Sequence, residues 1–245
     1  MALIKFNAVN VAYNPKIKIN LQNISFSANH NDVVCIIGKS GTGKTTLLNS
    51  ILHKEMVVSG NIIFLDQDLK TLNKKTWKKT VRKIGYLSQT VNSFEDDTVY
   101  LTIKRDLMNQ QVWWKKILFY LDYQQRLNIF QTLDKLGIIE HAFASINQLS
   151  QGQKQRVEIS KLLLKKPHLI LADEPTSALD QVTAELTIDL IKQLQKIHSC
   201  CILINIHDLN LLKKISNKTL AIKNGKILFY KKTKDVTKED LDLVY

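Results

Sequence analysis

Apolar residues occur along the chain in short runs separated by polar breaks, a pattern typical of strands in a globular domain. Residues 3–13 and 18–28 are apolar or alternating, with a polar break near Asn14-Pro15, and predict two antiparallel strands. Further strands are predicted for the apolar runs at residues 33–37, 57–64, 84–88, 169–172 and 201–205. Residues 219–230 predict a hairpin that turns at Asn224-Gly225.

Segments with helical periodicity lie between these runs. Residues 45–53, 184–198 and 209–216 predict single helices, whereas residues 69–83 read as a polar, lysine-rich surface stretch. Residues 90–165 predict a helical subdomain, because glycine is nearly absent and apolar residues recur at helical spacing. Strands that alternate with helices indicate one α/β domain over residues 1–245, with a largely parallel sheet in a core of about 1–89 and 166–245.

The composition limits the class of protein. Hydrophobic residues make up 44% of the 245 residues, but no apolar run approaches the ~20 residues needed to span a bilayer. The first residues lack the pattern of a secretory signal, so we expect the protein to stay where it is made. Cys35, Cys200 and Cys201 lie in apolar runs without metal-binding spacing, which predicts reduced, buried thiols in a cytosolic protein.

The net charge of +13 has two interpretations. A strongly basic chain can bind nucleic acid. Here only four of the basic residues are arginine, and the lysines are spread along the chain, as expected from an AT-rich genome. We therefore expect no nucleic-acid partner and favour attraction to an anionic membrane surface.

The strongest chemical signal is the motif G-x-x-x-x-G-K-T, which follows one predicted strand and opens the next predicted helix. In that context the motif predicts a phosphate-binding P-loop rather than an ordinary glycine turn. Backbone N–H groups and the helix dipole would hold the phosphates, with Lys44 reaching the β- and γ-phosphates and the Thr45 hydroxyl ligating Mg²⁺. The candidate nucleotide-binding residues are Gly38, Lys39, Ser40, Gly41, Thr42, Gly43, Lys44, Thr45 and Thr46.

A second signal is the apolar strand at residues 169–172 followed by Asp173 and Glu174, which resembles a Walker B motif. Asp173 would hold Mg²⁺ through its bound waters, and Glu174 would orient the attacking water. For an isolated Asp-Glu pair, two solvated acids would be the simpler interpretation. The P-loop upstream favours the Walker B interpretation.

The third signal is the sequence LSQGQ at residues 149–153. Ser150 and Gln153 have the spacing of a capping box and predict a helix that starts here. Such a capped helix N-terminus beside Gly152 can also bind a phosphate.

In this order, the P-loop, Gln89, LSQGQ, the Walker B motif and residues 177–180 resemble the ATP-binding-cassette (ABC) ATPases, across essentially the whole chain. The resemblance implies a P-loop NTPase core, an N-terminal antiparallel β part and a helical subdomain. It also implies that Tyr13 stacks on adenine and that Gln89 contacts Mg²⁺ and couples to a transport partner. His207 would contact the γ-phosphate as a catalytic switch residue.

The resemblance further implies a head-to-tail homodimer that binds two ATP molecules. Ser150, Gly152 and Gln153 would contact the nucleotide bound to the other subunit, and Asp180 would lie at the dimer interface. The usual signature is LSGGQ, and Gln151 replaces its first glycine. If position 151 requires φ > 0, glutamine is strained there; if it only precedes the helix, glutamine fits. Activity is expected to survive.

Among ABC proteins, the chain resembles the ATPase subunits of phosphonate-type importers at residues 110–137, 204–209 and 238–245. This implies hydrolysis of ATP to ADP and phosphate, a peripheral position on the cytoplasmic side of the cell membrane, and a separate membrane permease served by a substrate-binding protein. The helical subdomain is the expected docking element, although Trp113-Trp114 fit an ordinary subdomain core better than a partner contact.

The alternatives are an exporter subunit or a soluble ABC ATPase that assembles iron–sulfur clusters. Cassettes of DNA-repair proteins and translation factors are a further alternative. They resemble longer chains with coiled-coil inserts or paired cassettes, and this sequence shows neither feature. The transported substrate stays open.

Overall fold

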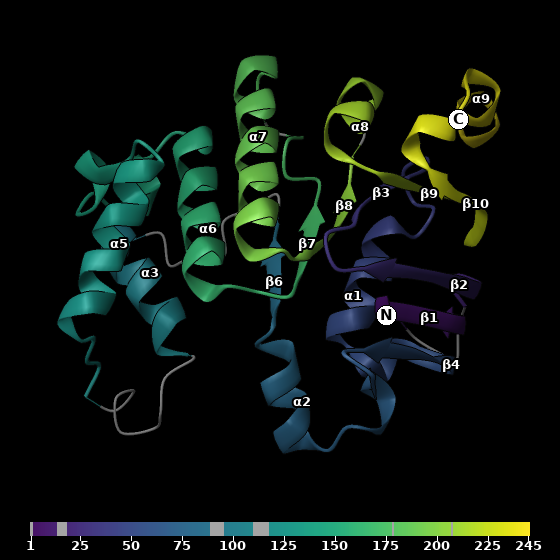
Figure 1. Cartoon of the computed structure of the whole chain (residues 1–245), viewed down its shortest axis with the longest axis horizontal. Coiled ribbons are helices and arrows are strands. Elements are labelled where there is room, and N and C mark those ends of the chain that lie inside the picture. Colours follow the sequence, from purple (N-terminus) through teal and green to yellow (C-terminus); the bar gives the residue numbers. More distant parts are fainter. Residues whose placement is uncertain (1, 14–18, 89–95, 110–117, 178, 207) are drawn as a thin grey trace.

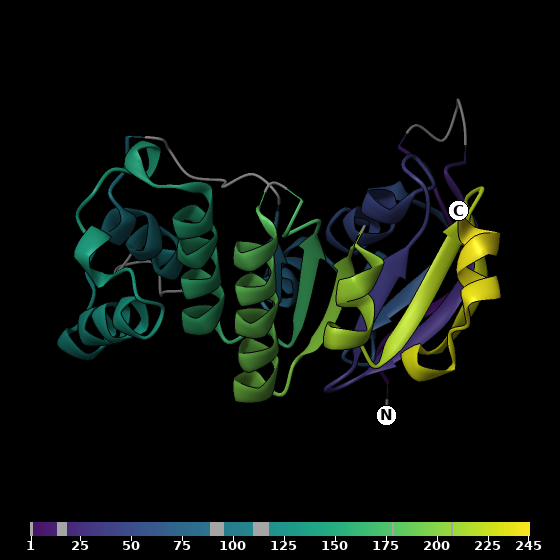
Figure 2. The same cartoon turned by 90° about the horizontal axis from the view of Figure 1, so that it is seen from above.

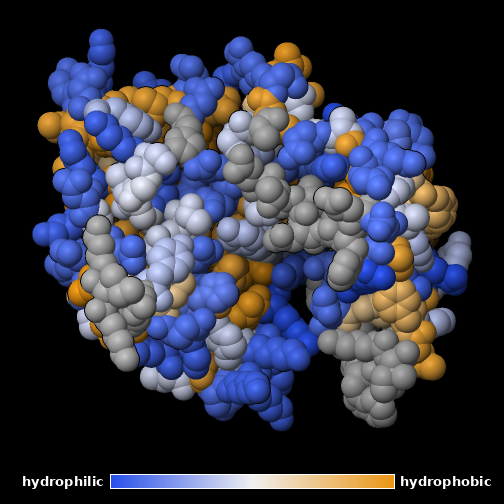
Figure 3. All heavy atoms as spheres, turned by 180° about the vertical axis from the view of Figure 1, so that it is seen from behind, coloured by the Kyte–Doolittle hydropathy of each residue, from blue (hydrophilic) through white to orange (hydrophobic). Residues whose placement is uncertain are grey.

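The structure is a computed structural model that describes residues 2–13, 19–88, 96–109, 118–177, 179–206 and 208–245. Two sheets and the helices packed on them make up the fold (Figure 1). The surface seen from behind is mainly hydrophilic, in keeping with the basic composition (Figure 3).

The smaller sheet is antiparallel, and its strand order is β2–β1–β4–β5. Its strands are β1 (Ala2–Val11), β2 (Leu21–Asn29), β4 (Val57–Phe64) and β5 (Gln67–Asp68). Two antiparallel strands at the start of the chain were predicted from the apolar pattern, and this is confirmed. The second of them begins later than predicted, at Leu21.

The larger sheet has the order β10–β9–β3–β8–β7–β6. Its strands are β3 (Val33–Ile37), β6 (Ile84–Leu87), β7 (Leu169–Asp173), β8 (Cys201–Asn205), β9 (Lys218–Lys223) and β10 (Lys226–Lys232). All neighbours are parallel except β9 and β10, which confirms the prediction of a largely parallel sheet. Asn224 and Gly225 have φ values of 51° and 72°, as a type I′ hairpin turn requires.

Helices cover both faces of the larger sheet. They are α1 (Lys44–Leu52), α2 (Lys74–Val81), α3 (Val99–Met108), α5 (Tyr123–Lys135), α6 (Gln151–Lys165), α7 (Gln181–His198), α8 (Leu209–Ile215) and α9 (Lys238–Val244). Figure 2 shows α6, α7 and α8 side by side along the sheet, with α3 and α5 beyond α6. None of the helices in the described part of the chain combines the length and apolar character needed to cross a membrane.

Two predicted elements differ from the structure. The lysine-rich stretch at residues 69–83 contains α2, which Asn73 caps by accepting a hydrogen bond from the Thr76 N–H at 3.0 Å. The helix predicted from residue 184 begins at Gln181, because Asp180 caps it through the Thr183 N–H.

The larger sheet separates two apolar clusters, since side chains alternate between the faces of a strand. Val33, Cys35 and Ile37 of β3 belong to the cluster that includes α7, α8 and the helices of residues 96–165. Val34 and Ile36 belong to the other, which includes α1 and the antiparallel sheet. The three cysteines are buried, as predicted.

Candidate functional site

The P-loop joins β3 to α1 at the carboxyl edge of the larger sheet. Gly38, Gly41 and Gly43 all have positive φ values, of 154°, 78° and 105°. A Cβ at Gly38 would lie only 2.4 Å from the backbone oxygen of Ile222 in β9, so this position accepts only glycine. The loop backbone is thereby fixed against the neighbouring strand.

Lys44 lies within the curve of this loop. Its Nζ donates hydrogen bonds to the carbonyl oxygens of Gly38 (2.8 Å) and Lys39 (3.1 Å). Burial lowers the pKa of Lys44, while the carboxylates of Glu174 and Asp173 act to raise it. The ammonium group is therefore held by loop carbonyls at a place where an anion would stabilise its charge.

The Asp173 carboxylate at the end of β7 receives hydrogen bonds from three separate elements. Thr45 Oγ1 of α1 and Asn205 Nδ2 of β8 donate to Oδ1, at 3.1 and 2.5 Å. The Tyr86 hydroxyl of β6 donates to Oδ2 at 3.4 Å. Burial and the charge of Asp173 raise the pKa of Tyr86 to about 12, so its hydroxyl stays protonated and donates.

The pairing of Thr45 with Asp173 is chemically suited to Mg²⁺. This ion prefers oxygen ligands and is held by one or two protein groups together with substrate phosphates and waters. In the part of the chain that the structure describes, no cluster of three His, Cys, Asp or Glu residues could hold a metal by itself. A metal at this site would need the phosphates to complete its coordination.

A pocket of about 660 Å³ opens over the P-loop, within the roughly 300–1,000 Å³ typical of small-molecule sites. Residues 39–46 and Glu174 line it. Glu174 has φ 50° and also lines an adjacent pocket of about 390 Å³ that reaches Asn205 and Asp208. The structure thus brings the P-loop and both predicted acids to one place.

Tyr13 lies beside the helix that follows the P-loop. Its hydroxyl accepts a hydrogen bond from Asn49 Nδ2 of α1 at 3.4 Å, and the side chain is 58% exposed. An exposed aromatic ring in this place is open to a stacking partner.

The signature residues form a capping box at the start of α6, as the sequence predicts. The Ser150 side chain accepts from the Gln153 N–H at 3.3 Å, and Gln153 Oε1 accepts from the Ser150 N–H at 2.8 Å. Gln151 is the first helical residue and is absent from the residues of positive φ, so glutamine is not strained there. The strained alternative for this position is therefore wrong.

Gly152 lies close to α7, because a Cβ there would meet Thr183 Cγ2 at 2.8 Å. Asp180 caps α7 by accepting from the Thr183 hydroxyl (2.6 Å) and backbone N–H (3.0 Å), which lowers the pKa of its carboxyl group. None of the signature residues or Asp180 is among the described residues that line the P-loop pocket. Gln89 and His207 lie outside the described residues.

A family model described as ABC transporter matches residues 21–177, more than half of the chain. The chain belongs to the ABC transporter family. It is an ATP-binding subunit of the kind that hydrolyses ATP to drive transport.

This ABC ATPase is 36% identical over 227 residues to a protein of Mesomycoplasma hyorhinis named "Probable ABC transporter ATP-binding protein p29", covering 93% of this chain and 90% of that protein. It is 34% identical to the "Phosphonates import ATP-binding protein PhnC" of Fusobacterium nucleatum, covering 92% and 91% of the two chains. It also resembles the solved dimeric structure of the ATP-binding cassette MJ0796 bound to ADP and Pi, with a TM-score of 0.80, 26% identity and 94% and 98% coverage. These similarities confirm the predicted fold and ATPase family.

Sequence reasoning missed several residues of the site. Tyr86 and Asn205 each lie on a strand next to β7, near the edge where Asp173 ends that strand, so strand order combined with polarity could have found them. Lys223 and Val244 line the pocket from β9 and α9, and no sequence pattern indicates them.

Proposed function

We propose that this ABC ATPase is the ATP-hydrolysing subunit of a high-affinity importer of the phosphonate type. The observation that carries the proposal is the contact of Thr45 with Asp173 beside Glu174, at the mouth of a pocket lined by the P-loop. The similarity to proteins named PhnC supports the importer class.

In this proposal, residues 38–46 bind the phosphates of ATP, and the Lys44 ammonium leaves its carbonyl partners to contact them. Thr45 and Asp173, together with Gln89, would hold Mg²⁺, which would supply neutralisation of the charge on the phosphates. Glu174 orients and polarises the attacking water, His207 contacts the γ-phosphate, and Tyr13 stacks on adenine.

The signature residues act on a second copy of the chain. Ser150, Gly152 and Gln153 do not line the pocket of their own P-loop in the described structure, although their capped helix N-terminus suits a phosphate. A head-to-tail homodimer would place them over the partner's nucleotide, with Asp180 at the interface. The MJ0796 cassette, bound to ADP and Pi, is itself dimeric.

The transport partner is an integral membrane permease, supplied with cargo by a substrate-binding protein. The helical subdomain of residues 90–165 is the proposed docking element, because it connects Gln89 to the signature at the start of α6. The protein would then lie peripherally on the cytoplasmic side of the cell membrane.

Glu174→Gln tests the catalytic assignment. The amide keeps the shape of the side chain but cannot act as a base, so we expect ATP binding and dimerisation to persist while turnover falls roughly 10²–10⁴-fold. Glu185→Gln is the control, because Glu185 forms an exposed ion pair with Lys214 on α8. Turnover of Glu174→Gln at the rate of the unsubstituted protein would show that another group is the base.

Co-purification tests the transport assignment. The chain, tagged and expressed with the genes that surround its own, should be recovered with a permease in detergent, and ATP-dependent uptake of a phosphonate should require Glu174. Recovery with a soluble iron–sulfur assembly complex, or export by the reconstituted pair, would replace the importer assignment.

A further inference from the structure

Besides Thr45, the Asp173 carboxylate is held by two side chains that the sequence did not single out as site residues. Asn205 ends β8 and is directly paired with Asp173 in the sheet register, while Tyr86 lies on β6 at the other side of β7. Their donors reach different oxygens of the carboxylate, Oδ1 for Asn205 (2.5 Å) and Oδ2 for Tyr86 (3.4 Å). Two donors on opposite sides fix the rotation of a carboxylate, which one donor does not.

The orientation of the Asn205 amide follows from the charge of its neighbour. Oδ1 turned toward a carboxylate would be repelled, so Nδ2 must face Asp173. Asn205 is fully buried, and its Oδ1 has no hydrogen-bond donor among the residues that the structure describes. A buried acceptor left without a donor lowers stability, so the amide is poorly explained by the needs of the fold.

The position of Asn205 connects two parts of the site. It borders the pocket of about 390 Å³ that Glu174 also lines, and it lies beside Thr45, whose hydroxyl shares the same Asp173 oxygen. A side chain that acts on the orientation of Asp173 therefore acts where the P-loop and the Walker B strand meet.

We infer that Asn205 and Tyr86 are positioning residues that hold the Asp173 carboxylate in the orientation needed to bind a divalent cation. The inference rests on the proposed role of Asp173 and adds the groups on which that role depends. Partners that orient metal-binding carboxylates commonly change metal affinity by roughly 10–100-fold when they are removed.

The test measures the affinity of the protein for a divalent cation. Mn²⁺ is titrated into the ADP-bound protein and its affinity is read by electron paramagnetic resonance. Asn205→Leu keeps the side-chain size and removes the donor, so Mn²⁺ should bind roughly 10–100-fold more weakly. Tyr86→Phe should give a smaller loss, because the hydrogen bond that it removes is longer.

Two further measurements separate positioning from a general loss of structure. ADP affinity in EDTA should stay within about twofold for both variants, and turnover should be largely restored at high Mg²⁺, because the P-loop contacts remain. Tyr230→Phe is the matched control, because it also removes a partly buried hydroxyl. That hydroxyl lies away from the site and donates to the Ser27 carbonyl with a hydrogen bond of 2.6 Å, so Mn²⁺ affinity should not change.

Asp173→Asn separates this inference from the proposed function. If Asp173→Asn itself leaves Mn²⁺ affinity unchanged, the metal role of Asp173 is wrong. If Asp173→Asn loses Mn²⁺ while Asn205→Leu, folded and binding ADP, retains it, the metal role stands and the positioning role is wrong. If Asn205→Leu does not fold, Tyr86→Phe decides: unchanged Mn²⁺ affinity in that variant overturns the inference.

Discussion

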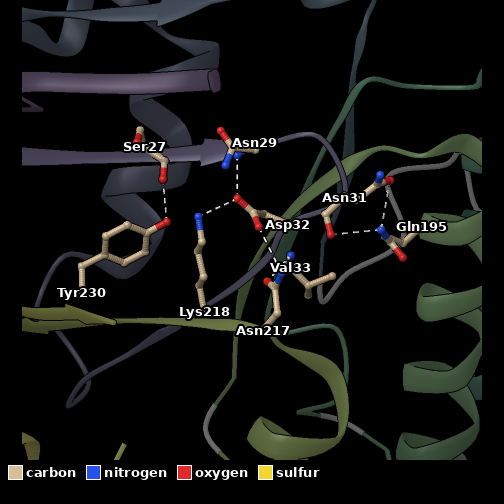
Figure 4. Close-up of polar contacts among 9 residues, drawn as sticks. All are labelled: Ser27, Asn29, Asn31, Asp32, Val33, Gln195, Asn217, Lys218 and Tyr230. Atoms are coloured by element: carbon tan, nitrogen blue, oxygen red, sulfur yellow. Dashed lines mark hydrogen bonds and ion pairs between the residues drawn. The ribbon is translucent and has the colours of Figure 1, made fainter. Parts of the chain in front are cut away.

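The two edges of the larger sheet each hold an aspartate that accepts a hydrogen bond from an asparagine amide, yet Asp32 is buried and Asp173 is half-buried, and the two acids have different surroundings. At the amino edge, Asp32 Oδ2 accepts from the Asn29 N–H (2.6 Å) and Lys218 Nζ (2.8 Å), and Oδ1 accepts from Asn217 Nδ2 (3.0 Å) (Figure 4). At the carboxyl edge, the donors to Asp173 within the described part of the chain are two hydroxyls and an amide.

The two aspartates differ in whether a cationic side chain is paired with them. Lys218 neutralises Asp32, and together they join β2, β3 and β9. Among the residues that the structure describes, Asp173 forms no ion pair, and Thr45 beside it lines the pocket. A buried charge is normally paired or coordinates a metal, and Asp173 is already half-buried. The amino edge carries its own cation and serves the fold, whereas the carboxyl edge is the place where we propose that a ligand binds.

Asp32→Ala should produce the greatest change in stability. It leaves the Lys218 ammonium and the Asn217 amide without their buried acceptor, so the free energy of unfolding should fall by about 3 kcal/mol. Denaturant titration measures this, and the ATP affinity of the native protein should be unchanged. A large loss of ATP affinity without loss of stability would show that the two edges are not separable in this way.

Lys44→Met tests the opposite edge. Methionine keeps the aliphatic length but not the charge, so ATP affinity should fall by roughly 10–100-fold, the value of one strong hydrogen bond to a charged group. Stability without nucleotide should hold or rise, because burial already disfavours the ammonium. Calorimetric ATP titration and thermal unfolding give the two values; a destabilised apo protein would mean that Lys44 serves the fold as Asp32 does.

Gln151→Gly restores the more usual signature glycine and should have a small effect. Because position 151 is helical, glycine should cost about 0.5 kcal/mol of helix stability and leave turnover within about twofold. Steady-state ATPase assays check the rate. A tenfold gain in turnover would show that glutamine limits the assembled site.

The smallest effect is expected from pH at the amino edge. Burial, with the charges of Lys83 and His30, lowers the pKa of His168 in the fold. Below about pH 6.5 the unfolded chain therefore binds more protons at this residue, so stability should decrease as the pH falls toward the folded pKa. His168→Gln should make the free energy of unfolding less dependent on pH in this range. If the pH dependence is unchanged in this variant, other groups cause it.

Much of this arrangement could be read from the sequence because its signals are local. The P-loop glycines, the capping box of Ser150 and Gln153, and the turn at Asn224-Gly225 each depend on a few adjacent residues. The start of α7 was also signalled locally, by Asp180 as a cap, but the apolar periodicity begins later and suggested a later start.

The site residues that could not be predicted depend on how the strands are aligned beside one another in the sheet. Tyr86 and Asn205 lie 87 and 32 residues from Asp173 and meet it only because β6 and β8 flank β7 in parallel register. Either residue alone is an ordinary strand residue in the sequence. Lys223 and Val244 reach the pocket through the packing of α9 on β9, which no pattern along the chain encodes.

The apolar cluster on one face of the larger sheet has a consequence for hydrogen exchange. It continues from Ile204 in β8 through Ile188 in α7 and Val157 in α6 to Leu133 in α5. Elements that share one core tend to open together, so backbone amides of α5 and β8 should exchange through a common opening. A ligand bound only at the P-loop edge would then slow exchange in helices that it never touches.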